Sequence, residues 1–319
     1  MKLIIQIPCL NEEDTLSKVI NDLPNQIDGI ETIEYLVIDD GSVDNTLDLA
    51  KSLGVHHIIS LGTNRGLAIA FVSGIEYALK QGADIVVNTD GDNQYYGDDI
   101  RKLVEPIISN NGDMVVGCRP IIKHPEFSMS KKFLQLVGSF VIRRLSKTSV
   151  RDATSGFRAF SKETALKLII HSKFSYTLEN LIQAGNIGLR VVSVDVKVNQ
   201  KTRDSRLFSS MPMYIKNSLS TMISMTFYYR PAFIFNIIAT FLLLGSLLLG
   251  GRFIFLIYLT SSPDLERTYL PSLILLSIFG TLSVLMFVAG FICELLAKHS
   301  RITEQIIKEV RYIRYRGDF

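Results

Sequence analysis

Two long apolar segments near the C-terminus limit the folds that this chain can adopt. Residues 233–259 contain one charged side chain, Arg252, and residues 270–293 contain none. Each segment is longer than the roughly 20 residues that a helix needs to cross the hydrocarbon of a bilayer. Two core helices would give the same pattern, but the lengths, the short polar connector at 260–268 and the flanking aromatic residues favour membrane spans. We therefore predict a transmembrane helical hairpin over residues 231–296.

Basic residues are concentrated outside these two segments. Lys216 and Arg230 precede the first, and the connector has only Arg267, next to two acidic residues. Six basic residues follow the second segment: Lys298, Arg301, Lys308, Arg311, Arg314 and Arg316. The positive-inside rule then places both termini, including a basic tail at 297–319, in the cytoplasm. The apolar stretch near Leu3 is too short for a signal peptide, so we expect the preceding domain to be cytoplasmic and the protein to be integral to the inner membrane.

Cysteine usage and net charge exclude several classes of protein. Cys9, Cys118 and Cys293 are isolated, without the CxxC spacing of a zinc site or a disulfide framework. Isolated cysteines are consistent with a reduced, cytosolic domain. The net charge is +3 over 319 residues, and aromatic and basic residues are not interleaved as in nucleic-acid-binding segments, so we expect no nucleic-acid partner.

The first 120 residues alternate between short apolar runs and amphipathic segments, which predicts a parallel sheet with helices on both faces. Strands are predicted at 2–7, 33–38, 56–60, 83–89 and 113–118, and helices at 12–23 (capped by Asn11), 44–53, 67–80 and 98–109. A helix at 131–145 and strands at 156–160 and 189–198 follow. A mixed helix within 208–230 lies in the membrane interface or packs as a linker; the sequence leaves both open.

Paired carboxylates follow the fourth predicted strand. Asp90 and Asp92 are two residues apart in an extended chain, so their side chains point to the same face. With a nearby amide oxygen they suit a hard divalent cation, Mg²⁺ or Mn²⁺. Asp39 and Arg119 follow other strands, at the edge where parallel sheets bind ligands. A solvated acidic turn would explain the two aspartates alone, but not polar groups from four segments at one edge. The chain lacks the G-x-G-x-x-G and P-loop patterns, which disfavours dinucleotide and P-loop folds.

Six motifs occur in a fixed order: IPCLNEE at 7–13, DDGSVD at 39–44, NRG at 64–66, DGDNQ at 90–94, VGCR at 116–119 and DATSGFR at 152–158. This series resembles the family 2 glycosyltransferases, and within them the polyprenyl-phosphate glycosyltransferases that include dolichol-phosphate mannose synthase. The resemblance covers residues 1 to about 229 and extends to the paired apolar segments. It implies a GT-A fold, a Rossmann-like, mostly parallel sheet flanked by helices, in a catalytic domain at 1–207.

The resemblance also implies roles for individual residues. The nucleotide sugar would be bound by Pro8, Asn11, Glu13, Asp39 and Asp90. The metal would be held by Asp90, Asp92 and Gln94, and the lipid phosphate by Arg119, Arg203, Ser205 and Arg206. Asp92, Arg119 and Asp152 would be catalytic, Asp152 as a base or as an orienting group. Two departures from the family pattern, Cys9 and the Tyr95-Tyr96-Gly97 stretch, imply altered base stacking and a different loop after the acidic motif.

These inferences predict a metal-dependent, inverting transfer of one sugar from a nucleotide-diphosphate sugar to a polyprenyl phosphate at the cytoplasmic face of the membrane. By analogy we favour a UDP-sugar over GDP-mannose. A processive polysaccharide synthase of the same fold is less consistent, because the chain has no Trp and only two predicted spans. A non-enzymatic membrane scaffold is disfavoured by the intact Asp90 and Asp92. The sequence leaves open whether the chain forms a homo-oligomer.

Overall fold

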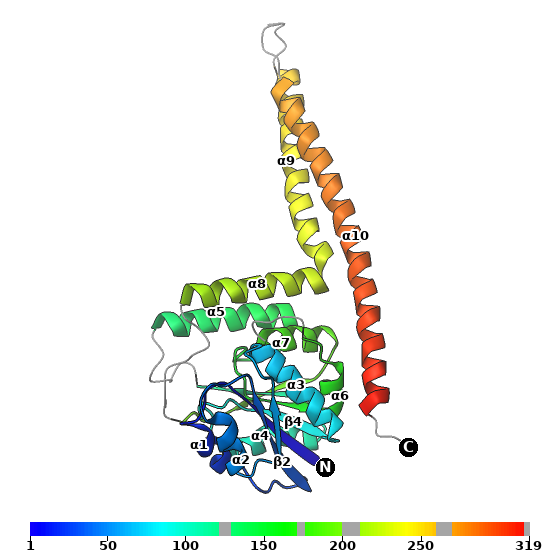
Figure 1. The fold of residues 1–319 in the computed structure, drawn as a ribbon. Coiled ribbons are helices and arrows are strands. Elements are labelled where there is room, and N and C mark those ends of the chain that lie inside the picture. Colours follow the sequence, from blue (N-terminus) through cyan, green and yellow to red (C-terminus); the bar gives the residue numbers. More distant parts are fainter. Residues whose placement is uncertain (121–128, 171–175, 200–210, 260–269, 316–319) are drawn as a thin grey trace. The chain divides into compact units, whose positions relative to one another are not determined.

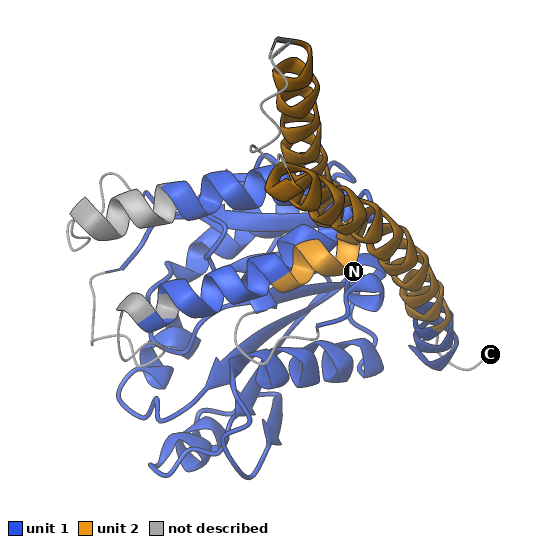
Figure 2. Cartoon of the chain, turned by 90° about the horizontal axis from the view of Figure 1, so that it is seen from above, with its two compact units in different colours: residues 1–223, 307–319 blue, residues 224–306 orange. Residues whose placement is uncertain are grey.

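The computed structural model describes residues 1–120, 129–170, 176–199, 211–259 and 270–315. The chain divides into two compact units (Figure 2). The first contains residues 1–223 and 307–319, and the second contains residues 224–306.

The first unit is built on a seven-stranded sheet with the strand order β3-β2-β1-β4-β6-β5-β7. Figure 1 labels two of these strands, β2 and β4, among the helices that surround the sheet. The strands are β1 (Lys2–Cys9), β2 (Thr32–Asp39), β3 (His57–Ser60), β4 (Ile85–Asn88), β5 (Met114–Cys118), β6 (Arg158–Ser161) and β7 (Val191–Asp195). Paired neighbours run parallel except β6, which is antiparallel to both β4 and β5. The predicted fold class, a mostly parallel α/β sheet, is confirmed.

Helices cover both faces of this sheet. One side carries α1 (Leu16–Asp22), α2 (Thr46–Ser52), the short 3-10 helix η1 (Gly97–Asp99) and α4 (Ile100–Ile108). The other carries α3 (Leu67–Lys80), α6 (Lys162–Lys167) and α7 (Tyr176–Asn186), with α5 (Met129–Ser146) packed on α7. In β1, Leu3, Ile5 and Ile7 join the core with α1 and α4, whereas Gln6 faces α3 and donates to Phe71 O. Burial on both faces explains why β1 reads as a nearly continuous apolar run.

Most predicted elements lie within a few residues of their predicted bounds, and α3 matches its predicted range, 67–80. The main error is the first helix, which begins at Leu16 rather than at residue 12. Asn11 does not cap it, because this residue has φ 56° and its side chain accepts a hydrogen bond from Val43 N. Residues 11–15 instead form a loop, in which Glu12 N donates to Thr46 Oγ1.

Two helices dominate the C-terminal part of the chain. After α8 (Met211–Tyr229), α9 (Pro231–Leu259) and α10 (Leu270–Tyr315) each contain a stretch long and apolar enough to cross a membrane, of which only 11% is buried. Within the second unit they meet through small residues: Ser283 Oγ donates to Ala239 O at 2.9 Å, and Gly290 lies against Phe235. Small residues allow such close approach between helices in a bilayer.

Candidate functional site

The polar residues of the site lie where β1, β2, β4 and β5 end and β6 begins. Cys9 and Asp39, the last residues of β1 and β2, are register partners. Asn88, the last residue of β4, pairs with Arg158, the first residue of β6. Because β6 runs antiparallel, the segment before it enters the sheet at this same edge. The antiparallel strand therefore brings the 152–158 motif next to the acidic motif at 90–94.

Asp90 is packed against the segment that precedes β6. A Cβ atom on Gly156 would lie 2.8 Å from Asp90 Oδ1, so only glycine leaves the carboxyl group this position. Burial and the negative charge of Asp92 raise the pKa of Asp90 to about 7, while Arg119 and Arg158 partly oppose them. A bound cation stabilises the ionised forms of two neighbouring carboxyl groups.

The residues present fit a magnesium or manganese ion. Within the described part of the chain, no three His, Cys, Asp or Glu side chains gather at one point. Two carboxylates with the remaining positions open to water and phosphate oxygens are a common arrangement for Mg²⁺. Gln94 connects the acidic motif to Arg119. Its backbone N–H donates to Asp92 Oδ1 at 3.1 Å, and its side-chain oxygen accepts a hydrogen bond from Arg119 Nη1 at 3.3 Å.

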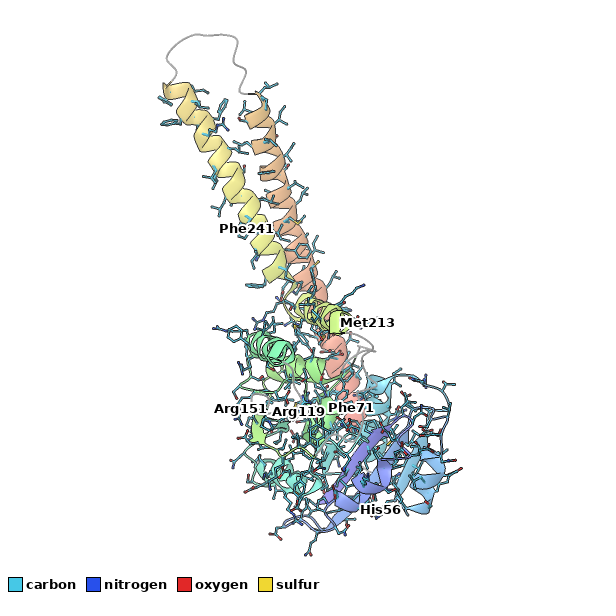
Figure 3. All side chains as sticks on the ribbon, turned by 90° about the vertical axis from the view of Figure 1, so that its left-hand side faces the viewer. His56, Phe71, Arg119, Arg151, Met213 and Phe241 are labelled. Carbon is cyan, nitrogen blue, oxygen red and sulfur yellow. The ribbon has the colours of Figure 1, made fainter. Side chains whose placement is uncertain are left out.

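Arg119 and Asp152 form a buried ion pair (Figure 3 labels Arg119). Arg119 Nε lies 2.7 Å from Asp152 Oδ2, and Arg119 Nη2 lies 3.1 Å from Asp152 Oδ1. Nη2 also donates to Thr154 Oγ1 at 2.9 Å. Burial alone would raise the pKa of Asp152, but the charge and hydrogen bonds of Arg119 lower it below the usual value. A carboxylate held in this way is a weak base and a good anchor for the guanidinium group.

Arg158 fixes the loop that carries Asp152. This fully buried side chain donates to the carbonyl oxygens of Ala153, Ser155 and Thr177 at 2.7–2.8 Å. Tyr95 supports the same loop, because its hydroxyl accepts a bond from Gly156 N and its ring stacks on Phe157 with centroids 4.7 Å apart. Tyr95 departs from the family pattern, and sequence reasoning did not give it this supporting position.

The residues predicted for the nucleotide converge on the loop between β2 and α2. Asn11 Oδ1 accepts from Val43 N, Glu13 Oε2 accepts from Asn45 N and Nδ2, and Asp39 accepts from Ser42 N. Pro8 is the residue before the last of β1.

Asp40 is a residue of this region that sequence reasoning did not assign. It is buried, and it accepts from the N–H groups of Arg65 and Gly66, which ties the NRG motif to the end of β2. Its position in the DDGSVD motif was the sequence signal that could have identified this residue. Arg203, Ser205 and Arg206 lie outside the described residues.

Comparisons with known proteins agree with this architecture. The model of glycosyl transferase family 2 matches residues 4–168, just over half of the chain. The chain is 35% identical over 216 residues to the UDP-N-acetylglucosamine–dolichyl-phosphate N-acetylglucosaminyltransferase of Methanococcus voltae, covering 60% of this chain and 83% of that one. It is 28% identical over 206 residues to the undecaprenyl-phosphate mannosyltransferase of Micrococcus luteus, covering 61% and 83%.

Among solved structures, the fold is similar to glucosyl-3-phosphoglycerate synthase of Mycobacterium tuberculosis in complex with Mn²⁺, UDP and glucosyl-3-phosphoglycerate. The TM-score is 0.54 at 20% identity, over 70% of this chain and 79% of that one. A likeness at this identity supports the fold, and the family match and the curated relatives support the class of enzyme. The resemblance inferred from the six motifs is confirmed, and the chain belongs to glycosyl transferase family 2.

Proposed function

We propose that this glycosyltransferase moves a single sugar from a nucleotide-diphosphate sugar to a polyprenyl phosphate. The observation that carries the proposal is the pairing of a family 2 catalytic unit with two apolar helices, in a chain whose relatives are named as transferases acting on dolichyl and undecaprenyl phosphates. A polyprenyl tail stays in the bilayer, because each CH₂ exposed to water costs about 0.8 kcal/mol. An enzyme anchored in the same bilayer can bind the phosphate headgroup at the membrane surface.

A UDP-sugar is the favoured donor, because the relative at 35% identity is named for UDP-N-acetylglucosamine. GDP-mannose is the second candidate, since other relatives are named as mannosyltransferases. Pro8, Asn11, Glu13 and Asp39 would form the nucleotide side of the pocket. Three of these side chains already hold the loop at 42–45, so this loop is the element that would shape the base and ribose site.

Asp90 and Asp92 would hold Mg²⁺ or Mn²⁺, with Gln94 beside them. The bound cation would supply positive charge to the departing nucleotide diphosphate. Burial and the charge of Asp92 raise the pKa of Asp90 to about 7, so a bound cation would favour the ionised form of the Asp90 carboxyl group. Gly156 lets the carboxyl group of Asp90 approach the 152–158 loop closely.

The lipid phosphate is itself an anion, so its oxygen can attack the anomeric carbon without a strong general base. The new bond joins that oxygen to the anomeric carbon while the bond from the carbon to the diphosphate oxygen breaks, which inverts the anomeric centre. Arg119 would stabilise phosphate charge, and Asp152 would orient it rather than accept a proton. Arg203, Ser205 and Arg206 are proposed to contact the lipid phosphate.

We further propose that α9 and α10 insert as a transmembrane hairpin with both chain termini in the cytoplasm. The proposed division is a catalytic domain at 1–207, a juxtamembrane helix at 208–230, spans at 231–296 and a basic tail at 297–319. The asymmetry of basic residues supports the orientation. The polar site of the first unit would then share the cytoplasmic side with its nucleotide donor.

The test is a transfer assay with the full chain in lipid nanodiscs that contain polyprenyl phosphate. Candidate UDP-sugars and GDP-mannose are supplied one at a time with Mg²⁺ or Mn²⁺, and the lipid product is identified by mass spectrometry. One added sugar per lipid supports the proposal. Products of several sugars would indicate a processive synthase, and the absence of transfer and of donor hydrolysis across the panel would favour a scaffold.

A further inference from the structure

The last part of α10 exposes several large aliphatic side chains, while some of its polar side chains bind other parts of the chain. Within the first unit, Arg311 donates to Glu76 Oε1 at 3.0 Å and to Leu168 O at 2.8 Å. Within the second unit Tyr228 donates to Glu304. The exposed surface of the same stretch carries aliphatic side chains next to Thr303, Gln305, Glu309 and Arg314, whereas a surface helix usually turns its aliphatic side chains inward.

We define the outward ridge as Ile302, Ile306, Ile307, Val310 and Ile313. These side chains are 39–78% exposed, and Ile313 is the most exposed of them. Five aliphatic side chains on about three turns of helix form an exposed apolar strip, and exposed apolar patches mark interaction sites. The ridge is therefore a candidate contact surface.

Lipid does not cover the ridge if α10 crosses the bilayer. The apolar span ends near Leu296, and 17 further residues at 1.5 Å each place Ile313 about 25 Å beyond that point along the helix. The polar layer of one leaflet is only about 6 Å thick, and a tilt of about 20° changes the height little. Most of the ridge consequently stands in water on the cytoplasmic side.

The spacing along the ridge matches a parallel pairing of identical helices. In a heptad numbering with Thr303 and Val310 at a positions, Ile306 and Ile313 occupy d positions. These a and d residues would form the contact between two helices, and they recur every 3.5 residues on average. Glu309 then falls at g and Arg314 at the following e, where opposite charges meet across a parallel pair. Arg314 is exposed, and Glu309 is 67% exposed with one long, exposed contact to Lys308 at 3.9 Å, so both side chains can reach a partner helix. Copies inserted in one membrane face the same way, which makes their helices parallel.

We propose that the outward ridge packs against the same ridge of a second copy of this chain. The proposal rests on membrane insertion, which fixes the parallel orientation. Two heptads form a weak coiled coil in isolation, but confinement to the membrane raises the effective concentration of one copy around another. Arg311 and Glu304 of each helix keep their contacts with their own chain, so pairing requires no rearrangement of either side chain.

The first test uses single cysteines in a full-length, cysteine-free background, in which Cys9, Cys118 and Cys293 are replaced. Ile306→Cys and Ile313→Cys should form disulfide-linked dimers in native membranes at least about tenfold faster than Gln305→Cys, an exposed c position on the same helix. Equal cross-linking at 305, 306 and 313 would overturn the proposal. So would a lipid-induced blue shift of a polarity-sensitive dye at 306 and 313 without cross-linking, because it would place the ridge on the membrane.

The second test concerns the charged pair. Glu309→Arg should reduce Ile313→Cys cross-linking severalfold, and Glu309→Arg combined with Arg314→Glu should restore it. Failure of the double variant to restore the rate would contradict the parallel register. Resistance of the chain to extraction by alkaline carbonate tests membrane insertion separately. Loss of cross-linking in an inserted chain would therefore count against pairing and not against the proposed transferase activity.

Discussion

Lowering the pH should weaken metal binding through the protonation of Asp90. Burial and the charge of Asp92 raise the pKa of Asp90 to about 7. A carboxyl group with a raised pKa holds its proton up to that pH, and a bound cation must displace the proton. In the metal-free protein, the stabilising effect of this neutral form is present at acidic pH and is lost as the pH rises through about 7.

The size of the effect follows from the fraction of Asp90 that is ionised. With a pKa of about 7, about one tenth of the group is ionised at pH 6 and about nine tenths at pH 8. The apparent Kd for Mn²⁺ should therefore be about tenfold higher at pH 6 than at pH 8. Each bound Mn²⁺ should release about 0.9 proton at pH 6 and about 0.1 proton at pH 8.

Isothermal titration calorimetry of the full chain, in buffers with different ionisation enthalpies, measures both quantities. Asp48→Asn is a matched control, because this carboxylate on α2 is 79% exposed and lies outside the site. The control should keep the pH dependence of the original chain, whereas Asp90→Asn should lose both the proton release and most of the affinity. A Kd for Mn²⁺ that is the same at pH 6 and pH 8, with no proton released, would refute the reasoning.

Four further outcomes are expected. Asp152→Asn should leave Arg119 without its buried counter-charge and lower the free energy of unfolding by about 3–5 kcal/mol, measured by urea titration; an unchanged midpoint would contradict the buried pair. Gly156→Ala should weaken Mn²⁺ binding by at least about tenfold, because the new methyl group would crowd Asp90; unaltered calorimetry would count against that packing. A single cysteine at Ser262 should react with an impermeant reagent only from the side opposite the cytoplasm, and cytoplasmic labelling would disprove the hairpin. Arg206→Ala should raise the requirement for polyprenyl phosphate much more than that for the donor in steady-state assays, and the reverse pattern would move Arg206 to the donor site.

Local patterns in the sequence predicted most of the fold. The helix at 67–80 follows a glycine with φ 96° and keeps a regular apolar face, so its range could be read directly. The strand before Asp90 is a short run of Val and Ile that is buried on both sides. The paired apolar helices were evident from their length and lack of charge. Each of these signals depends on residues that are close together in the chain.

The errors and omissions concern contacts between distant residues. The start of α1 was misplaced because the left-handed backbone of Asn11 is fixed by Val43, 32 residues away. The pairing of Arg119 with Asp152 spans 33 residues, and no local pattern distinguishes an orienting carboxylate from a base. The antiparallel direction of β6, which brings this pair to the acidic motif, depends on where the chain re-enters the sheet.

The most direct test of the proposed activity compares the original chain with Asp92→Asn in nanodiscs that contain polyprenyl phosphate. With the preferred nucleotide sugar and Mg²⁺ or Mn²⁺, the original chain should attach one sugar to each lipid phosphate, with inverted anomeric configuration. A chelator should abolish transfer, and Asp92→Asn should lower the rate by at least about 100-fold while its thermal unfolding stays unchanged. Transfer at the original rate by Asp92→Asn in the presence of chelator, or a donor that is hydrolysed without any lipid product, would contradict the account.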